Sequence, residues 1–394
     1  MRAFTHESRC KIKNATLLLP TGIHKNKSIV FESEKIIEIS DDQLVDNNMP
    51  TLDAEGLFVA PGCIDTHIHG GGGHDFTEAT PEAFRIAASA HARYGTTALF
   101  PTLAAAPLSV FKEAIHVCET IMQDEPQGAR ILGLHLEGNY LNKIMCGGQN
   151  PAYLTLPDVE EYKDLVRNTS CIKRWSAAPE LPGALAFGRF MSEQGILVSL
   201  AHTVADYPLV AQAWEAGYTH ATHFYNAMTG VHKQGEYKKE GTIESVYLIK
   251  DMTVELISDG VHVPPAILKL VYTIKGADKI MLITDAMAPS ACTNPVSHDS
   301  RVIIEDGVCK LADRSALAGS VATSDRLIRT MVKQAGIPLS DAVRMASETP
   351  ARIMGIYDRK GSLEVGKDAD IIIFDDNIEI HTTIVEGRIV YSKK

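Results

Sequence analysis

The sequence predicts an α/β protein, a (β/α)8 TIM-like barrel with a small β-sandwich domain built from both ends of the chain. Three observations lead to this fold class. Eight short apolar runs alternate with amphipathic stretches in the middle of the 394 residues. Most of these runs end in or near a histidine, a glutamate or an aspartate. The two ends of the chain, in contrast, contain only short strand-like segments with turn residues between them.

The two ends of the chain are predicted to form one domain. Residues 1–56 contain the strand-like runs CKIKNATLLL, SIVFES and KIIEIS, and residues 357–394 contain ADIIIFDD and HTTIVEGRIVYS. Gly, Asn and Asp separate these runs, as is typical of strands joined by turns. We therefore expect both segments to pair into a small β-sandwich, and residues 57–356 to form the barrel.

The eight apolar runs of the middle segment have the length of buried parallel strands. The stretches between them, such as PEAFRIAASAHAR and PLSVFKEAIHVCETIM, have helical periodicity. Eight strand–helix units are the number that closes a barrel. The runs are LFVAPGCIDTHIHG, GTTALFPTL, ILGLHLEG, IKRWSAAPE, ILVSLAH, THATHFYNA, MTVELISDG and MLITDAM.

Composition excludes several functional classes. The net charge of −11, from 49 acidic and 38 basic residues, argues against nucleic acid as a partner, because a phosphate backbone requires a basic face. No apolar run approaches the roughly 18 residues of a membrane-spanning helix, and the N-terminal sequence lacks a signal-peptide pattern. Seven scattered cysteines without a CxxC pair indicate reduced thiols in a cytoplasmic protein.

Residues that can bind a metal end four of the apolar runs. His67 and His69 end the first run, and because residues two apart on a strand point the same way, both imidazoles can reach one ion. Glu137 ends the third run, where a buried carboxylate needs a counter-charge. His202 and His223 mark the ends of the fifth and sixth runs. Since barrel enzymes place their sites at the C-terminal strand ends, we expect these five side chains to converge.

Each of these residues also has a structural interpretation when it is taken alone. An HxH pair can be two polar residues at a strand end, a lone glutamate can cap a helix or form a salt bridge, and a single histidine can be a hydrogen-bonded core residue. Histidines at the ends of two consecutive strands favour the metal site.

Asp285 marks the end of the eighth run, in LITDAMAP, and is expected to face the same site. An aspartate beside a metal-bound water is well placed to accept its proton, because the metal lowers the pKa of that water to about 7. A fifth metal ligand is the alternative, and both roles are compatible at different points in a cycle. The sequence contains no GxSxG elbow, P-loop or strand-linked GxGxxG that would indicate other chemistry.

This order of ligands along the strands resembles the amidohydrolase superfamily. Within it, the chain closely resembles the N-acetylglucosamine-6-phosphate deacetylase family from about residue 50 to the C-terminus. The resemblance implies a cytoplasmic, metal-dependent hydrolase that removes acetate from the 2-acetamido group of an amino-sugar 6-phosphate. It rests on PGCIDTHIHG, GTTALFPTL, LGLHLEG, SAAPE, ATHFYNAM, SDGVHV, TDAMAP, LAGS, ASETPARIMGI and GSLEVGKDADIIIFD.

The resemblance also implies a set of metal ligands and a quaternary structure. Glu137, His202 and His223 would hold the main divalent metal. His67 and His69 would hold a second ion, with Glu137 bridging, so that one or two ions bind per subunit. Zinc or iron suits these nitrogen and oxygen ligands. The implied assembly is a homodimer.

The family further implies roles for residues around the metal. Asp285 would take a proton from the attacking water and later give it to the leaving amine. His262, in DGVHV, would contact the sugar or stabilise the oxyanion. Asn226 and Ala227 would offer polar contacts to the phosphate or the sugar, and Gln149 fills a substrate-binding position that is often histidine in the family.

One segment departs from the family pattern. The family usually has an Arg-Glu-Pro-Gly string after Asn-Ala-Met, and its arginine binds the substrate phosphate. Here the segment is TGVHKQGEYKKEGTIE, without arginine. Lysine can bind phosphate without the bidentate fork, so Lys233, Lys238 or Lys239, together with His232, are candidates to replace it. The alternatives are a substrate without a phosphate, a different amino sugar, or a solvated loop.

Three hypotheses therefore remain open. The first is deacetylation of N-acetylglucosamine-6-phosphate. The second keeps the fold and metal but changes the amide, as in an unphosphorylated N-acetylamino sugar or an N-acyl-amino-acid deacylase. A cyclic amidase is disfavoured because the fourth run ends in SAAPE without the expected lysine. The third hypothesis is a sugar-sensing barrel without turnover.

Overall fold

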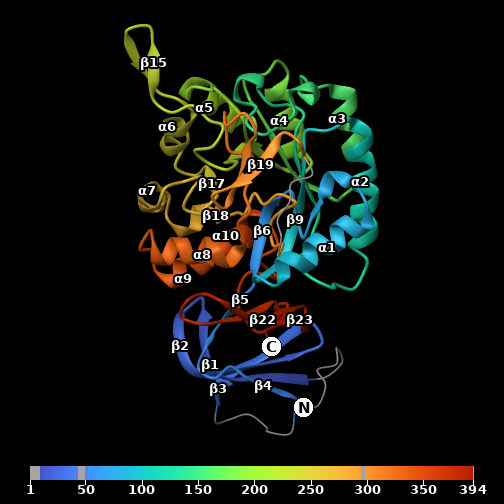
Figure 1. Cartoon of the computed structure of the whole chain (residues 1–394), viewed down its shortest axis with the longest axis vertical. Coiled ribbons are helices and arrows are strands. Elements are labelled where there is room, and N and C mark those ends of the chain that lie inside the picture. The colour runs from blue at the N-terminus through green and yellow to red at the C-terminus, as the bar shows by residue number, and fades with distance from the viewer. Residues whose placement is uncertain (1–8, 43–48, 294–298, 394) are drawn as a thin grey trace.

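The computed structural model describes residues 9–42, 49–293 and 299–393. Figure 1 shows a barrel stacked on a smaller sheet-rich part, which contains the first and the last described strands of the chain. This arrangement confirms the predicted fold class, a barrel carrying a β domain built from both termini. The boundaries at residues 56 and 357 stay a prediction.

The terminal part is a sheet to which both ends of the chain contribute. Within the described residues its eight strands run in the order β23-β22-β21-β5-β1-β2-β3, with β4 beside β1. The strands from the two ends meet where β5 pairs antiparallel with β21. Inward side chains such as Ile12, Ile29 and Ile371 form its separate hydrophobic core. The bounds are β1 (Arg9–Leu19), β2 (Gly22–Glu32), β3 (Lys35–Asp41), β4 (Thr51–Asp53), β5 (Phe58–Pro61), β21 (Ile371–Phe374), β22 (Ile380–Val385) and β23 (Arg388–Ser392).

The barrel contains the eight predicted strands, all parallel, in the described part of the chain. The order is β6-β9-β11-β12-β13-β14-β17-β18, with the short β10 also paired to β9. Just beyond the end of the last strand, the Asp285 N–H donates to the carbonyl of His67 in the first strand at 2.9 Å and so connects the two sides of the barrel. The bounds are β6 (Cys63–Ile68), β9 (Thr96–Ala104), β10 (Arg130–Ile131), β11 (Leu134–Glu137), β12 (Ile172–Ala177), β13 (Leu197–Leu200), β14 (Tyr218–Ala221), β17 (Thr253–Leu256) and β18 (Ile280–Leu282).

Helices cover the outside of the barrel, and several begin at sequence-encoded caps. Thr80 caps α1 and is followed by Pro81, while Asp158 and Asp206 cap α3 and α5 through their side chains. The bounds are α1 (Pro81–Ala92), α2 (Leu108–Ile121), α3 (Val159–Arg167), α4 (Ala184–Glu193), α5 (Tyr207–Glu215), α6 (Thr242–Leu248), α7 (Pro265–Lys275), α8 (Ser324–Lys333), α9 (Leu339–Ala346) and α10 (Glu348–Ile353).

Short hairpins extend from the loops that follow the barrel strands. The hairpin of β15 (His232–Gln234) and β16 (Tyr237–Lys239) projects from the barrel at the upper left of Figure 1. A second hairpin, β19 (Val302–Glu305) with β20 (Val308–Leu311), follows the last barrel strand. Smaller elements are β7 (Gly70–Gly71), β8 (His74–Asp75) and the 3₁₀ turns Phe76–Glu78, Lys143–Met145, Pro151–Tyr153 and Ala277–Lys279.

No helix in the described ranges is long and apolar enough to cross a membrane. Every cysteine lies in those ranges and is a free thiol.

Candidate metal centre and active-site cavity

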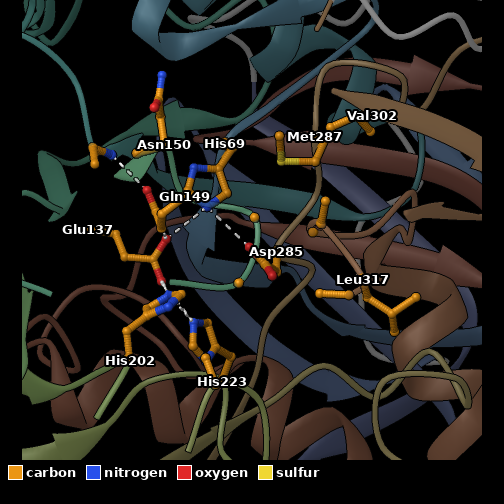
Figure 2. A pocket seen from close by; sticks show the side chains of 18 of the residues that line it. His69, Glu137, Gln149, Asn150, His202, His223, Asp285, Met287, Val302 and Leu317 are labelled. Carbon is orange, nitrogen blue, oxygen red and sulfur yellow. Dashed lines mark hydrogen bonds and ion pairs between the residues drawn. The ribbon is translucent and has the colours of Figure 1, made fainter. Parts of the chain in front are cut away.

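The residues that end the barrel strands converge on one point. Figure 2 shows His69, Glu137, His202, His223 and Asp285 directed toward one another beside a cavity. All are buried, and so is His67. They form two neighbouring groups with metal-ligand geometry, one of Glu137, His202 and His223 and one of His67, His69 and Asp285. The structure thus brings together all six side chains that the sequence placed at the site.

The first group is arranged as a set of acceptors. Glu137 Oε1 lies 2.9 Å from His223 Nε2 and 3.3 Å from His202 Nε2, and the two Nε2 atoms are 3.1 Å apart. Each ring also bonds a backbone carbonyl through Nδ1, His202 to Met145 at 2.7 Å and His223 to Asn226 at 3.1 Å. A carbonyl accepts only, so each Nδ1 carries a hydrogen, and in the neutral ring that binds a metal Nε2 would present a lone pair. A cation between these three atoms would satisfy them.

The second group lies on the other oxygen of the same carboxylate. Glu137 Oε2 is 3.2 Å from His69 Nε2 and 3.4 Å from His67 Nε2. Asp285 Oδ1 is 3.1 Å from His69 Nε2 and 3.4 Å from His67 Nε2. Glu137 therefore has one oxygen toward each group and could contribute to both. The imidazole and carboxylate donors fit divalent zinc or iron.

The electrostatics of this cluster favour positive charge at its centre. Burial opposes charge on Glu137, but His67, His202 and His223 outweigh it and hold the pKa of this carboxyl well below its usual range. Burial likewise lowers the pKa of His67, yet the carboxylates of Glu137, Glu255 and Asp285 raise it to about 9. The cluster therefore attracts positive charge, and a metal ion can supply it.

Three of the six residues adopt an unusual backbone conformation. The φ angles of His202, His223 and Asp285 are 44°, 26° and 48°, in the left-handed region that non-glycine residues rarely occupy. Such strain persists only where surrounding structure enforces it, and it gathers at functional sites. Here it turns the side chains at the ends of three strands toward the common centre.

Gln149 contacts one of the candidate metal ligands directly. Its Nε2 donates to Glu137 Oε2 at 2.8 Å, and its Oε1 accepts the Ala105 N–H at 2.8 Å. The side chain is almost fully buried and lines the cavity. In this structure Gln149 therefore orients the carboxylate of Glu137, and its predicted contact with substrate stays a prediction.

A cavity of about 650 Å³ opens over the candidate metal ligands. Such a volume accommodates a phosphorylated monosaccharide, since small-molecule sites usually measure about 300–1,000 Å³. Asn226, Ala227 and His262, to which the family resemblance assigned contacts with the substrate, line this cavity, and those contacts stay a prediction. His262 is held by Asp259, whose carboxylate accepts from Nδ1 at 2.8 Å, while its buried Nε2 has no hydrogen-bond partner among the described residues.

The lysine-bearing segment lies away from this cavity. His232 and Lys233 are exposed on β15 and do not line it, because the hairpin projects from the barrel (Figure 1). Lys238 lies on the same hairpin, and Lys239 pairs with Asp206 at 2.7 Å. Within one chain, the structure does not bring these predicted phosphate-binding residues to the site.

Sequence reasoning missed three residues near the site. Arg301, beside β19, is the one Lys or Arg that lines the cavity among the described residues. Asp259 orients His262, and its place three residues earlier in SDGVHV was an available signal. Glu255 bonds His67 Nδ1 at 3.1 Å, but it is hidden inside the apolar run MTVELISDG.

Comparisons with known proteins agree with this fold. A sequence profile described as the Amidohydrolase family matches residues 175–390. An N-acetylglucosamine-6-phosphate deacetylase of Lysinibacillus sphaericus is 31% identical over 382 residues, 96% of this chain and 97% of the relative. An N-acetylgalactosamine-6-phosphate deacetylase of Escherichia coli O157:H7 is 33% identical over 340 residues, 86% of this chain and 88% of the relative.

A solved structure extends the agreement to three dimensions. The crystal structure of N-acetylglucosamine-6-phosphate deacetylase from Pasteurella multocida superimposes with a TM-score of 0.90 at 28% identity. The match covers 98% of this chain and 100% of that chain. The barrel and the terminal sheet therefore share one arrangement in both proteins.

Proposed function

The chain belongs to the amidohydrolase family, among its N-acetylglucosamine-6-phosphate deacetylases, and from that premise we propose that it hydrolyses N-acetylglucosamine-6-phosphate with a bound divalent metal. The products would be acetate and glucosamine-6-phosphate. The observation that carries the proposal is the convergence of Glu137, His202 and His223 on one point, with Asp285 beside them.

The chain's own residues would divide the work as follows. Glu137, His202 and His223 would hold one ion, and His67 and His69 a second. A bound ion polarises the acetamide carbonyl and lowers the pKa of water. Asp285 would accept the proton of the attacking water and return it to the amine nitrogen as the C–N bond breaks. Its pKa supports the basic form, since His67 and His69 outweigh burial and lower it.

Substrate orientation would fall to the wall of the cavity. His262 Nε2, unpartnered and held in place by Asp259, would donate to or accept from a sugar hydroxyl or the developing oxyanion. Asn226 and Ala227 would contact the sugar or the phosphate. The charge of Arg301 makes it our candidate for the phosphate contact; its present partner is Asp299, at 2.6 Å, and a phosphate would compete for it.

The first experiment is an acetate-release assay on metal-reconstituted protein. N-acetylglucosamine-6-phosphate is compared with unphosphorylated N-acetylglucosamine, and Asp285→Asn is the inactive control. A strong preference for the phosphorylated sugar, lost in the control, is the expected result. Equal or reversed preference would remove the phosphate from the proposal, and binding without acetate release would favour a sensor.

Arg301→Ala separates phosphate recognition from chemistry. If Arg301 binds the phosphate, KM for the phosphorylated sugar rises about tenfold or more while kcat changes little. Lys233→Ala is the matched control on the hairpin. A rise in KM for Lys233→Ala alone would return the phosphate contact to the hairpin, with the lysine reaching the cavity of a second subunit.

A second candidate keeps the reaction and changes the sugar. The relative from Escherichia coli O157:H7, named for N-acetylgalactosamine-6-phosphate, is 33% identical to this chain. Including that sugar in the acetate assay decides between the two epimers through the ratio of kcat/KM values. An N-acyl amino acid in the same assay tests the remaining enzyme alternative.

We also propose a cytoplasmic homodimer. The free cysteines suit a reducing compartment. Val231, Tyr237 and Leu248 are exposed apolar side chains on and near the projecting hairpin, where a second subunit would cover them. Light scattering on the purified chain should give twice the monomer mass, and Tyr237→Glu should shift it toward the monomer.

A further inference from the structure

We propose that Glu255, anchored by Arg174, is a positioning residue that holds both halves of the metal centre in register. The inference rests on the proposed metal-dependent function. It concerns side chains below the ligands, inside the barrel, and gives Glu255 and Arg174 a role in metal affinity rather than in substrate contact.

One carboxylate oxygen of Glu255 touches both ligand groups. Glu255 Oε2 lies 3.1 Å from His67 Nδ1 and accepts the backbone N–H of His223 at 3.1 Å. His67 belongs to the group with His69 and Asp285, whereas His223 belongs to the group with Glu137 and His202. One oxygen of Glu255 therefore contacts a residue of each ligand group.

The contact with His67 determines which ring nitrogen can bind a metal. An ionised carboxylate accepts hydrogen bonds and donates none, so His67 Nδ1 must carry a hydrogen. The opposite nitrogen, Nε2, is then left to face His69, Glu137 and Asp285. A carboxylate behind a metal-binding histidine is a common device for fixing its tautomer and orientation.

The contact with His223 supports a strained backbone. His223 has a φ of 26°, and its amide would lack this partner if Glu255 were removed. The carbonyl of Glu255 also accepts the Phe224 N–H at 2.9 Å. Glu255 therefore holds the turn at the end of β14 that aims the His223 ring at the metal.

Arg174 compensates the buried negative charge of Glu255 and fixes the orientation of its carboxylate. Both side chains are fully buried and form an ion pair between Arg174 Nη1 and Glu255 Oε1. Arg174 Nε donates to Ser199 Oγ at 3.0 Å, and Nη2 donates to Thr222 Oγ1 at 2.9 Å. These bonds come from three neighbouring strands and hold the guanidinium rigidly, so the second carboxylate oxygen points at the ligands.

The test compares two glutamate-to-glutamine variants. In Glu255→Gln, the NH₂ of the amide must face either Arg174 or the pair His67 and His223. In both orientations a donor then faces other donors, so hydrogen bonds are lost. Glu386→Gln is the matched control, because Glu386 is also buried and paired, with Arg130 and Lys360, at the junction with the terminal sheet. The measurements are the Zn²⁺ Kd by chelator competition and the Tm of the metal-free chains.

The expected result is a Zn²⁺ Kd about 10–100-fold weaker in Glu255→Gln, with Glu386→Gln within twofold of the wild type. Both variants should lose stability, so the difference in Kd isolates the positioning role. An unchanged Kd in Glu255→Gln, or an equal loss in both variants, overturns the inference. If the wild type itself binds no Zn²⁺, the proposed metal centre fails first.

Arg174→Lys is the second variant, for the case in which Glu255→Gln does not fold. It keeps the positive charge and the ion pair but loses the fork that reaches Ser199 and Thr222. We expect an intermediate weakening of the Zn²⁺ Kd, about three- to tenfold by the same reasoning. A wild-type Kd in this soluble, folded variant counts against the role of Arg174 as the anchor.

Discussion

Two clusters of buried ionisable side chains differ in how their charge is balanced. One lies at the C-terminal ends of the barrel strands and contains Glu137, Asp285 and four histidines. The other lies where the barrel meets the terminal sheet and is centred on Lys360. In the second cluster the chain supplies a lysine, whereas in the first the ion-pair partners of Glu137 and Asp285 among the described residues are all imidazoles.

The cluster at the junction contains its own positive charge. Lys360 Nζ lies 2.7 Å from Asp370, 3.0 Å from Asp368 and 3.0 Å from Glu386. These carboxylates outweigh burial and raise the pKa of the lysine. The comparison teaches that a buried cluster with its own lysine stabilises structure, whereas a cluster of imidazoles and carboxylates without one can take up an added cation.

The largest expected effect is a loss of activity on changing the cluster at the C-terminal ends of the barrel strands. Asp285→Asn removes the proposed proton acceptor, and kcat/KM should fall about 10²–10⁴-fold, or about 3–5 kcal/mol in the transition state. The acetate assay measures the loss, and the Tm of the folded variant should change little by comparison. Retention of more than a tenth of wild-type kcat/KM would mean that another group accepts the proton.

The next effect should come from the junction and should leave activity intact. Lys360→Met removes a buried cation from between three carboxylates, and the free energy of unfolding should drop by about 3–5 kcal/mol. Urea unfolding measures it. Lys393→Met is the control, because Lys393 forms an exposed pair with Glu379 and should cost under about 1 kcal/mol. An equal loss of unfolding free energy in both variants would show that the buried cluster stabilises the fold no more than an exposed ion pair does.

Metal removal should affect only the cluster at the rim. Adding Zn²⁺ at about 100 times its Kd should stabilise the folded chain by about 2.7 kcal/mol, and chelation should reverse the gain in Tm. The same gain is expected in Lys360→Met, because both metal-ligand groups found among the described residues lie at the strand ends and not at the junction. Full activity and an unchanged Tm after exhaustive chelation would contradict metal dependence.

An isolated buried histidine provides a smaller, pH-dependent effect. His91 is fully buried, its Nε2 bonds the Gly70 carbonyl at 3.0 Å, and burial lowers its pKa from 6.5 to about 4. The unfolded chain therefore binds a proton between these pH values while the folded chain does not, so stability falls as pH decreases. From pH 7 to pH 5 the loss is about 2 kcal/mol.

His91→Gln tests the origin of this loss. The amide keeps a donor for the Gly70 carbonyl but does not titrate, so the decrease in unfolding free energy between pH 7 and pH 5 should shrink by about 2 kcal/mol. Urea unfolding at the two pH values measures it. An unchanged decrease would assign the acid sensitivity to other groups, such as the charged clusters.

Several features were accessible from sequence because their signals are local. The eight strands followed from apolar runs of the right length, and all are present. The ligands followed from chemistry at the run ends, since His67, Glu137 and His202 each interrupt apolar sequence where a strand stops. The pairing of the two chain ends followed from their shared strand-and-turn pattern, and β5 with β21 realises it.

Other features depended on contacts across the chain. Lys233 was a reasonable candidate for a phosphate site, yet its hairpin leaves the barrel, a direction that composition does not encode. Arg301 lines the cavity with residues from distant parts of the chain, such as His69 and Glu137, and nothing in its local sequence indicates that. Glu255 and Arg174 were hidden, because in a strand buried on both faces the alternation of polar and apolar residues is lost.

The sequence by itself determined the order and type of the strands and the kinds of ligand at their ends, because both arise from local periodicity and side-chain chemistry. Only the tertiary structure decided which charged groups share a space. That outcome depends on barrel closure and strand register, which bring Arg174 to Glu255 across 81 residues and His67 to Glu255 across 188.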